Sequence, residues 1–369
     1  MSDKKFSREQ LLVLVALNLS FLFVGMRFSL QGPFYPPESE RRGLSATQYS
    51  LVMGIYQLVV FFASPITGNN LNKLGIKSTL AAGMGIVGVN TTLFGALGYI
   101  EDGQLFLAFS FILRIIEGIG YAGLSTAGFS LIVYTFPHNA ATMFGMLETF
   151  GGLGLMLGPF LGGVIYSAVG FTLPFVLLGI GLIRTSILTN FLPLQPQIHS
   201  KNYDTKIMLK VFKVPGICVA LLSAFCVAMS GGFLIATLEP YARMKFDMSI
   251  VQIAYVSMLG AVAYGVSAPI VGVICKKYSV NIAACLGVIL MIVSFALIGP
   301  LPFLQITASQ YLSISAFVTH GIGSAFQIVA SFAKAHKQAI MKGFPDTIET
   351  YVVVSGLFAS FHDLGLFVV

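Results

Sequence analysis

The stretch Ser64-Pro65-Ile66-Thr67-Gly68 returns 204 residues later in the chain as Ala268-Pro269-Ile270-Val271-Gly272. Two more landmarks keep this register, since Ser45-Ala-Thr-Gln48 returns as Ser249-Ile-Val-Gln252 and Lys73 returns as Lys277. In each copy the Ser-x-x-Gln pattern predicts a capping box that opens an apolar helix, and the Pro-Ile-x-Gly turn followed by lysine predicts its end. One membrane-spanning unit is therefore used twice in parallel orientation, as in transporters built from two related halves.

Composition places nearly the whole chain in a membrane. The sequence is 56% hydrophobic and only 9% charged, with a mean hydropathy of +0.87, and a soluble domain is not so poor in charge. The net charge of +7 fits basic residues on cytoplasmic loops and does not indicate nucleic-acid binding. All four cysteines lie in apolar stretches, so they do not form the disulfide framework of a secreted domain.

Apolar runs of about twenty residues predict eleven membrane spans. Six lie near residues 10–31, 49–68, 78–99, 105–134, 143–168 and 172–192, and five near 215–239, 250–275, 280–300, 310–333 and from 348. A polar stretch with four lysines separates the two sets and predicts a linker. We therefore expect an all-α membrane protein with a six-helix bundle over residues 1–192, a linker over 193–214 and a second bundle over 215–369.

The distribution of basic residues predicts the orientation of these spans. With the amino terminus in the cytoplasm, most of the 21 lysines and arginines fall on cytoplasmic loops, as the positive-inside rule requires. The opposite, lumenal side then carries five acidic residues, Glu38, Glu40, Glu101, Asp102 and Asp247. We therefore expect a cytoplasmic amino terminus and a cytoplasmic linker.

The fifth span contains a glycine-rich string, Gly154-Leu-Met-Leu-Gly158-Pro159-Phe-Leu-Gly162-Gly163. Small residues at every fourth position give a smooth helix face on which another helix packs closely, and Pro159 bends the helix and frees a carbonyl. Close packing alone is one interpretation of this string. The other is functional, because the string resembles the antiporter motif of the major facilitator superfamily.

Two further motifs resemble that superfamily. Arg114-Ile-Ile-Glu117-Gly118-Ile-Gly120 in the fourth span resembles its Arg-x-x-(polar)-Gly-x-Gly motif. The loop Gly68-Asn-Asn-Leu-Asn72-Lys73-Leu-Gly75-Ile-Lys77 resembles its signature between spans two and three, and implies a gating loop. Asn72 stands where the superfamily usually has an aspartate, so the charge-relay form of this gate is not implied.

A resemblance to a narrower family runs from about Gly32 to Phe358. It is carried by segments such as Phe136-Pro137-His-Asn-Ala-Ala-Thr142, Leu147-Glu148-Thr149-Phe150-Gly151-Gly152 and Leu238-Glu239-Pro240. These resemble solute carrier family 18, the vesicular amine transporters, and most closely its B-type branch, the vesicular polyamine transporters. The resemblance implies a twelve-span fold and uptake of cationic amines into acidic vesicles in exchange for lumenal protons. The first span lacks the aspartate of the monoamine members, which favours polyamines.

Ionisable residues inside the spans are candidates for the substrate and proton site, because such groups are costly in lipid. Glu148 is the strongest, since a lone carboxylate before the glycine string can bind a proton and a cationic substrate in turn. Arg114 and Glu117 share one helix face, and either form a structural pair or take part in proton coupling. Glu239, before Pro240, is either an interfacial residue or a substrate or proton ligand.

Three further residues complete the candidate site. His320 lies near the middle of its span and either titrates in an acidic vesicle or is satisfied by a neighbouring helix. Tyr56 and Tyr264 lie in the repeated spans, where an aromatic face either holds an ammonium group or merely packs. Arg27 and Arg184 would repel a cation, so we expect them to pair with acids or to reach an interface.

The carboxyl end leaves two functions open. The repeat register sets Val369 opposite Ile165, so we expect the second half to be incomplete, and residues 359–369 stand where the family has a Gly-Pro-x-x-Gly-Gly run. Either the chain is a proton-coupled antiporter of cationic amines in secretory or synaptic-type vesicles, or it is a shortened product that transports nothing and acts as a membrane partner of the full-length transporter. The sequence contains no nucleotide-binding loop, metal cluster or catalytic triad, so we expect neither an enzyme nor a cofactor, and the oligomeric state stays open.

Overall fold

The structure of the chain, a computed structural model, describes residues 6–191, 206–248, 250–298 and 309–368. The side chains of a few helical residues, Asn72 and Glu239 among them, lie outside the described part. Within these ranges eleven helices are long and apolar enough to cross a membrane, which confirms the predicted number of spans. They are α1 (Arg8–Arg41), α2 (Ala46–Leu74), α3 (Ile76–Ala96), α4 (Gly103–Thr135), α5 (Ala140–Val169), α6 (Thr172–Thr189), α8 (Pro215–Phe246), α9 (Ile250–Lys277), α10 (Val280–Ile298), α11 (Gln310–Met341) and α12 (Ile348–Phe367). A 3-10 turn, η1 (Leu97–Tyr99), and a short helix, α7 (Lys206–Val211), lie between them.

Capping boxes start the first two helices. At α2 the predicted box is present, because the Gln48 amide donates to Ser45 Oγ at 3.4 Å and the Ser45 amide donates to Gln48 Oε1 at 2.8 Å. Ser7 and Gln10 form the same arrangement at α1. These bonds satisfy backbone donors that the start of a helix leaves free, so they fix where each helix begins. The repeat of the box at Ser249 lies outside the described residues.

The repeated proline motifs lie inside helices, so the predicted turns at these motifs are wrong. α2 continues through Pro65 to Leu74, and α9 continues through Pro269 to Lys277. A proline inside a helix leaves the carbonyl four residues earlier without its hydrogen bond, which is the physical reason for expecting a break. Here another helix supplies the missing donor in both copies.

Two hydroxyl groups donate hydrogen bonds to the carbonyl oxygens that the prolines leave without a donor. Ser360 Oγ of α12 donates to Phe61 O of α2 at 2.6 Å, and Thr149 Oγ1 of α5 donates to Gly265 O of α9 at 2.6 Å. An unsatisfied carbonyl in lipid costs several kcal/mol, so these bonds allow both helices to pass their prolines. Each bond also joins a helix before the linker to a helix after it.

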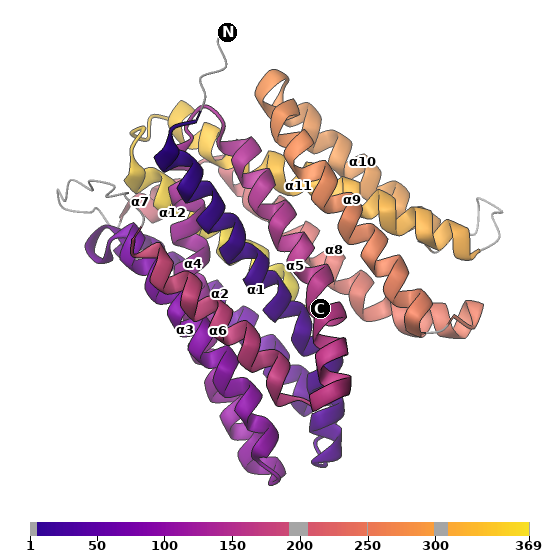
Figure 1. The fold of residues 1–369 in the computed structure, drawn as a ribbon. Coiled ribbons are helices and arrows are strands. Elements are labelled where there is room, and N and C mark those ends of the chain that lie inside the picture. Colours follow the sequence, from indigo (N-terminus) through magenta and orange to yellow (C-terminus); the bar gives the residue numbers. More distant parts are fainter. Residues whose placement is uncertain (1–5, 192–205, 249, 299–308, 369) are drawn as a thin grey trace.

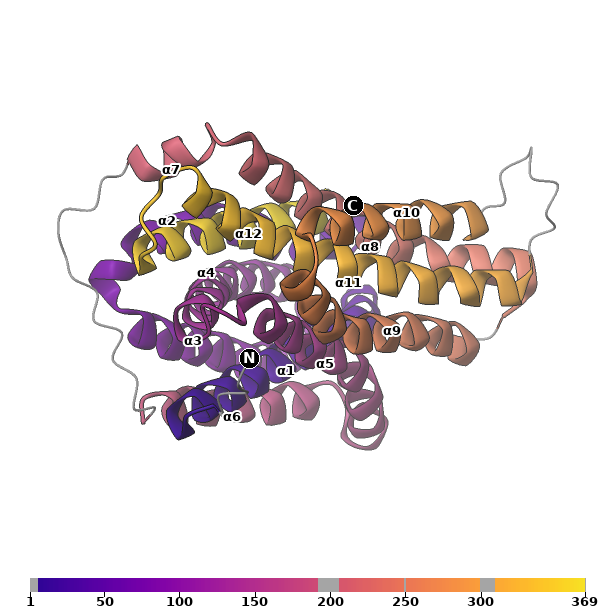
Figure 2. The ribbon, with the colours of Figure 1, turned by 90° about the horizontal axis from the view of Figure 1, so that it is seen from above.

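The helices pack in two sets that meet along two seams (Figures 1 and 2). In the first set the main contacts are α1 with α5, α3 with α6, α3 with α4, and α2 with α4. In the second set they are α10 with α11, α9 with α11, and α8 with both α11 and α12. The seams are α5 against α9 and α2 against α12. In Figure 1 the sets converge near the N terminus and α7, and α9 diverges from α3 and α6 toward the opposite end.

Close contacts between the two sets gather on the side where α1 begins, which we call the N-terminal side. There Lys276 Nζ, near the end of α9, donates to Asn139 Oδ1, just before α5, at 2.5 Å. Further along the same seam, Gly145 of α5 packs on the backbone of α9, since a Cβ on it would lie 2.8 Å from Ala268 C. The structure is therefore closed between the sets on this side.

Four phenylalanines, one each from α4, α5, α11 and α12, fill the junction of the two sets, and we call them the aromatic cluster. Its members are Phe129, Phe144, Phe332 and Phe358. The rings of Phe144 and Phe332 are nearly parallel, with centroids 3.9 Å apart and an interplanar angle of 9°. All four side chains are buried, so the cluster is an apolar seal made by both sets.

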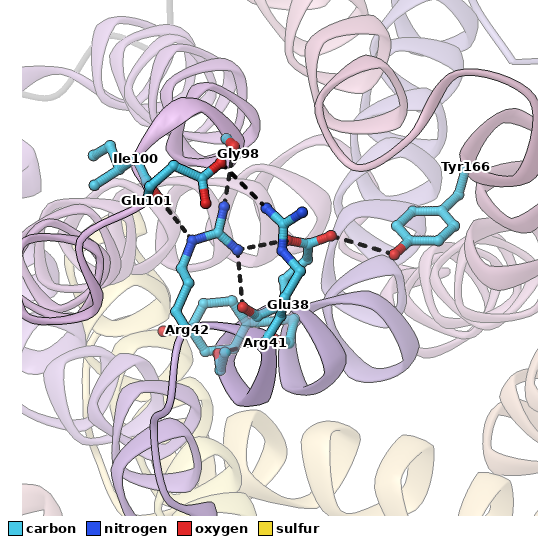
Figure 3. A network of polar contacts seen from close by, with 9 residues as sticks. Glu38, Arg41, Arg42, Gly98, Ile100, Glu101 and Tyr166 are labelled. Carbon is cyan, nitrogen blue, oxygen red and sulfur yellow. Dashed lines mark hydrogen bonds and ion pairs between the residues drawn. The ribbon is translucent and has the colours of Figure 1, made fainter.

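The end of α1 is held by a network of polar contacts on the opposite side (Figure 3). The predicted first span ends near residue 31, whereas α1 continues to Arg41 through three prolines. Arg42 Nε donates to Ile100 O at 2.6 Å, its Nη2 donates to Gly98 O at 3.0 Å, and Tyr166 OH donates to Glu38 Oε1 at 3.4 Å. These bonds tie the extension of α1 to η1 and α5, which explains why the helix extends beyond its apolar stretch.

Candidate functional site

Four polar side chains from α1, α3 and α4 form a buried cluster within the first set of helices. The Glu117 carboxylate pairs with Arg27 and with Arg114, whose Nη1 lies 3.1 Å from Glu117 Oε2. Thr91 donates to Glu117 Oε1 at 3.3 Å. Arg27, which the sequence predicts to pair with an acid or reach an interface, is thus paired. Both arginines and Glu117 are fully buried, so two positive charges and one negative charge lie away from water.

Tyr56 of α2 lies beside both guanidinium groups and offsets part of their excess positive charge. Its ring centroid is 4.7 Å from Arg27 Cζ and 4.4 Å from Arg114 Cζ, within the range of cation–π attraction. Arg114 also donates to the carbonyl oxygens of Val52 at 3.3 Å and Met53 at 3.1 Å. In this structure the Tyr56 ring therefore contacts the protein's own cations.

Glu148 lies where the two sets of helices meet. It is half-buried on α5, and its Oε2 accepts a hydrogen bond from the hydroxyl group of Tyr264 on α9. Gly152, one turn later on α5, lies against that tyrosine, because a Cβ on it would be 3.5 Å from Tyr264 Cδ1. No described lysine, arginine or histidine pairs with Glu148. A carboxylate accepts about four hydrogen bonds, so one hydroxyl donor leaves capacity for a proton or a cation.

Asp363 of α12 is a buried acid outside the set of residues predicted for the site. It is 4% exposed and interacts electrostatically with Glu148, Tyr56 and Tyr121. Because residues 359–369 do not follow the family pattern, their acid receives no role from the resemblance. A simpler property of the sequence points to Asp363, because any ionisable residue within an apolar run is a functional candidate.

Two acid and base candidates remain, His320 and Glu239. His320 of α11 has its Nε2 3.0 Å from Ser230 Oγ of α8 and its Nδ1 3.3 Å from Ser324 Oγ. A neighbouring helix therefore satisfies His320, which is one of the two alternatives that the sequence leaves open. Glu239 belongs to α8, and its side chain lies outside the described residues.

The glycine string of α5 packs directly on α1. A Cβ on Gly154 would lie 2.8 Å from Met26 N, and one on Gly158 would contact Met26 O and Ser29 Oγ. One on Gly162 would meet the Leu30 side chain, and one on Gly163 would lie 3.9 Å from Phe34 Cζ. Pro159 lies inside α5 between these glycines. The string therefore serves close helix packing, whatever further role it has in transport.

The predicted gating loop is a tight junction between α2 and α3. Gly75 alone separates the two helices, and its φ of +80° is a conformation that side chains disfavour. Gly68 lies about two turns earlier in α2, where a Cβ would be 3.1 Å from Val352 O of α12. The three polar candidates of this junction are exposed Lys73, half-buried Lys77 and Asn72, whose side chain lies outside the described residues.

Known proteins resemble this chain over most of its length. The model of the Major Facilitator Superfamily matches residues 17–369. The MFS-type transporter SLC18B1 of Mus musculus is 32% identical, and the match covers 99% of this chain and 80% of that protein. The synaptic vesicular amine transporter of Homo sapiens is 26% identical over 67% of this chain and 47% of its own length. The crystal structure of the human organic anion transporter MFSD10 superposes with a TM-score of 0.74, covering 97% of this chain and 91% of that chain at 16% identity, which is a likeness of fold alone.

Proposed function

The chain belongs to the major facilitator superfamily and, within it, to the SLC18 family, and on this premise we propose that it is a proton-coupled antiporter that moves cationic amines into vesicles. The observation that carries the proposal is the position of Glu148. Its carboxylate lies at the seam between the two sets of helices, and among the described residues its partner is a tyrosine hydroxyl and not a basic side chain. It is therefore free to bind a proton and an ammonium group alternately, which is the exchange that an antiporter performs.

The two sets of helices are the moving halves in this proposal, with residues 1–192 and 215–369 rocking about the linker. The aromatic cluster closes one side in this structure, so substrate and protons reach Glu148 from the other side. Opening the N-terminal side requires the phenylalanine rings to separate and the seam from Asn139 to Glu148 to part from α9. Because Tyr264 comes from α9, that same movement removes the hydroxyl donor from Glu148 and exchanges its ligand.

Orientation and location follow from the charge distribution and the relatives. We place the N-terminal side in the cytoplasm, because most of the basic residues then lie there. We place the protein in secretory or synaptic-type vesicles, in line with its vesicular relative. The closed side then faces the cytoplasm and the open side faces the lumen.

The substrate class that we favour is a polyamine. α1 carries no acidic residue between Glu9 and Glu38, so the monoamine-type aspartate of the first span is absent. The substrate therefore depends on acids of the other helices, among them Glu148 and, from the sequence, Glu239. Separate acids suit a substrate with separate ammonium groups. His320, Arg114, Glu117 and Tyr56 support the site in this proposal by holding the helices that surround it.

Transport by the purified chain tests the proposal. Proteoliposomes with an acidic interior are expected to accumulate radiolabelled spermidine, and a protonophore is expected to abolish the accumulation. Uptake of radiolabelled serotonin and dopamine is measured in separate, parallel assays. Uptake of serotonin or dopamine without spermidine would refute the polyamine assignment, and uptake that ignores the protonophore would refute proton coupling.

A further inference from the structure

Asp363 lies on the face of α12 that contacts α2. On one side of it along the helix, Ser360 Oγ bonds to Phe61 O of α2. On the other side, the Phe367 ring lies 3.6 Å from the position of a Cβ on Gly54 of α2. Asp363 is one turn from each of these residues, so it shares their helix face.

The register of the seam sets Asp363 near Gln57 of α2. The two helices run antiparallel, since Gly54 meets Phe367 and Phe61 meets Ser360. Gln57 lies between Gly54 and Phe61, as Asp363 lies between the two partner residues, so both occupy the same level of the seam. Gln57 is 5% exposed, and its Oε1 has no hydrogen-bond partner among the described residues.

Gln57 Oε1 is a buried acceptor without a donor among the described residues, although the Gln57 amide also carries two N–H donors of its own. Asp363 is 4% exposed, and no described residue donates a hydrogen bond to it or forms an ion pair with it. Buried oxygens of this kind are normally hydrogen-bonded, and a buried charge without a partner is more costly still. A ligand that fits them must bring several N–H donors and a positive charge, which describes an ammonium group.

Glu148 adds a second carboxylate within electrostatic range of Asp363. Like charges in a low-dielectric interior repel, and while both acids are ionised two positive charges are needed to balance them. Two ammonium groups joined by an apolar chain would neutralise both at once. The aromatic ring of Tyr121, which also interacts with Asp363 and is only partly buried, offers such a chain an apolar surface.

We propose that Asp363 and Gln57 form a second ammonium subsite, separate from the subsite of Glu148 and Tyr264, so that the substrate is an elongated chain with an ammonium group at each end. This inference rests on the proposed function and assigns residues to its substrate class. It also sets a length, because the substrate must reach from α5 to the seam of α2 and α12.

A competing role for Asp363 lies within the protein. Arg27 pairs with Glu117 but its Nε and Nη1 have no hydrogen-bond partner among the described residues, and Tyr56 interacts with both Arg27 and Asp363. In another conformation Asp363 could pair with Arg27 instead of with substrate. Such a charge pair would matter equally for every substrate, whatever its number of ammonium groups.

The test compares a series of linear diamines with the matching monoamines in the reconstituted full chain. Wild-type protein is expected to bind diamines of one chain length best, measured as KM for uptake and as ligand-dependent thermal stabilisation in detergent. Asp363→Asn keeps size and removes charge, and should raise the diamine KM by at least about tenfold and flatten the dependence on chain length, while the monoamine KM stays within about twofold. Gln57→Leu should act in the same direction but more weakly, and Asp247→Asn, at an exposed loop position, is the matched control.

The outcomes separate this inference from the function on which it rests. If wild-type protein takes up no amine and is stabilised by none, the proposed function fails and the subsite fails with it. If wild-type protein transports amines but Asp363→Asn weakens monoamines and diamines equally, Asp363 belongs to an internal charge pair. An unchanged chain-length optimum in Asp363→Asn likewise overturns the subsite. The thermal stability of each variant is also measured without ligand, so that a misfolded variant is recognised as such.

Discussion

Among single residues, Glu148 differs from Glu117 in what surrounds it. Glu117 is neutralised by two arginines, whereas Glu148 has only the Tyr264 hydroxyl among described partners. Glu148→Gln keeps that hydrogen bond and removes the charge, so we expect proton-driven amine uptake to fall at least about tenfold while the protein stays folded. Uptake in acid-loaded proteoliposomes measures this. Glu101→Gln, an exposed carboxylate, is the control, and uptake by Glu148→Gln within twofold of wild type would remove Glu148 from the site.

Glu117 is expected to be important for stability. Glu117→Gln leaves two guanidinium groups buried without a counter-charge, and breaking a buried ion pair from one side costs about 3–5 kcal/mol. We expect a large drop in the temperature at which the detergent-solubilised protein loses its monodisperse peak in size-exclusion chromatography. The double variant Glu117→Gln/Arg114→Gln removes one of the two stranded charges, so part of the loss should return. A Glu117→Gln protein as stable as wild type would contradict the ion-pair account.

On the scale of elements, the contact between α1 and α5 depends on the absence of side chains along the glycine string. Gly158→Ala would push a methyl group against Met26 O, and overpacking of this kind typically costs about 1–3 kcal/mol. Gly151, on the same helix, has no atom within 4 Å of its would-be Cβ, so Gly151→Ala is a matched control. Thermal unfolding in detergent should separate the two variants. Equal stability would mean that α1 and α5 pack less tightly than the structure shows.

The seam between α5 and α9 depends on the hydroxyl group that satisfies the carbonyl freed by Pro269. Thr149→Val removes the donor to Gly265 O and leaves that acceptor unsatisfied, at a cost of about 1–3 kcal/mol to the closed arrangement. We expect the population closed on the N-terminal side to fall on the order of tenfold. Distances between spin labels at His138 and Tyr278 report that population. Thr185→Val removes a hydroxyl that bonds within its own helix, to Gly181 O, so its distance distribution should match wild type.

On the scale of the whole molecule, the structure is closed on one side of the membrane and its halves part toward the other. Cysteines introduced by Asn139→Cys and Lys276→Cys, in a background without native cysteines, should react with a short reversible cross-linker, since the wild-type side chains are hydrogen-bonded. Cross-linking should stop transport, and reduction should restore it. Cysteines at Ser167 and Tyr255, toward the opposite ends of α5 and α9, should not be joined by the same reagent while the N-terminal side is closed. Efficient cross-linking of that second pair would contradict the open side.

The sequence by itself determined the class of the protein, the number of its spans and the surfaces on which they pack. Hydropathy and the spacing of glycines are local properties, and lipid forces every apolar run of sufficient length into a helix. The same local logic singled out Glu148, because an acid in an apolar run is rare. The predicted helix ends at the motifs of Pro65 and Pro269 are wrong, because both helices continue through these prolines.

The tertiary structure alone decided how polar groups find their partners. Ser360 and Thr149 satisfy the carbonyls before those prolines from helices remote in the chain, and Tyr264 reaches Glu148 from the other half. Asp363 can be noticed in the sequence as an acid in an apolar run, but only the register of α2 and α12 sets it near Gln57. Such pairings depend on the rotation and relative height of packed helices, and many sequence-distant groups contribute to both. No spacing within one segment encodes them.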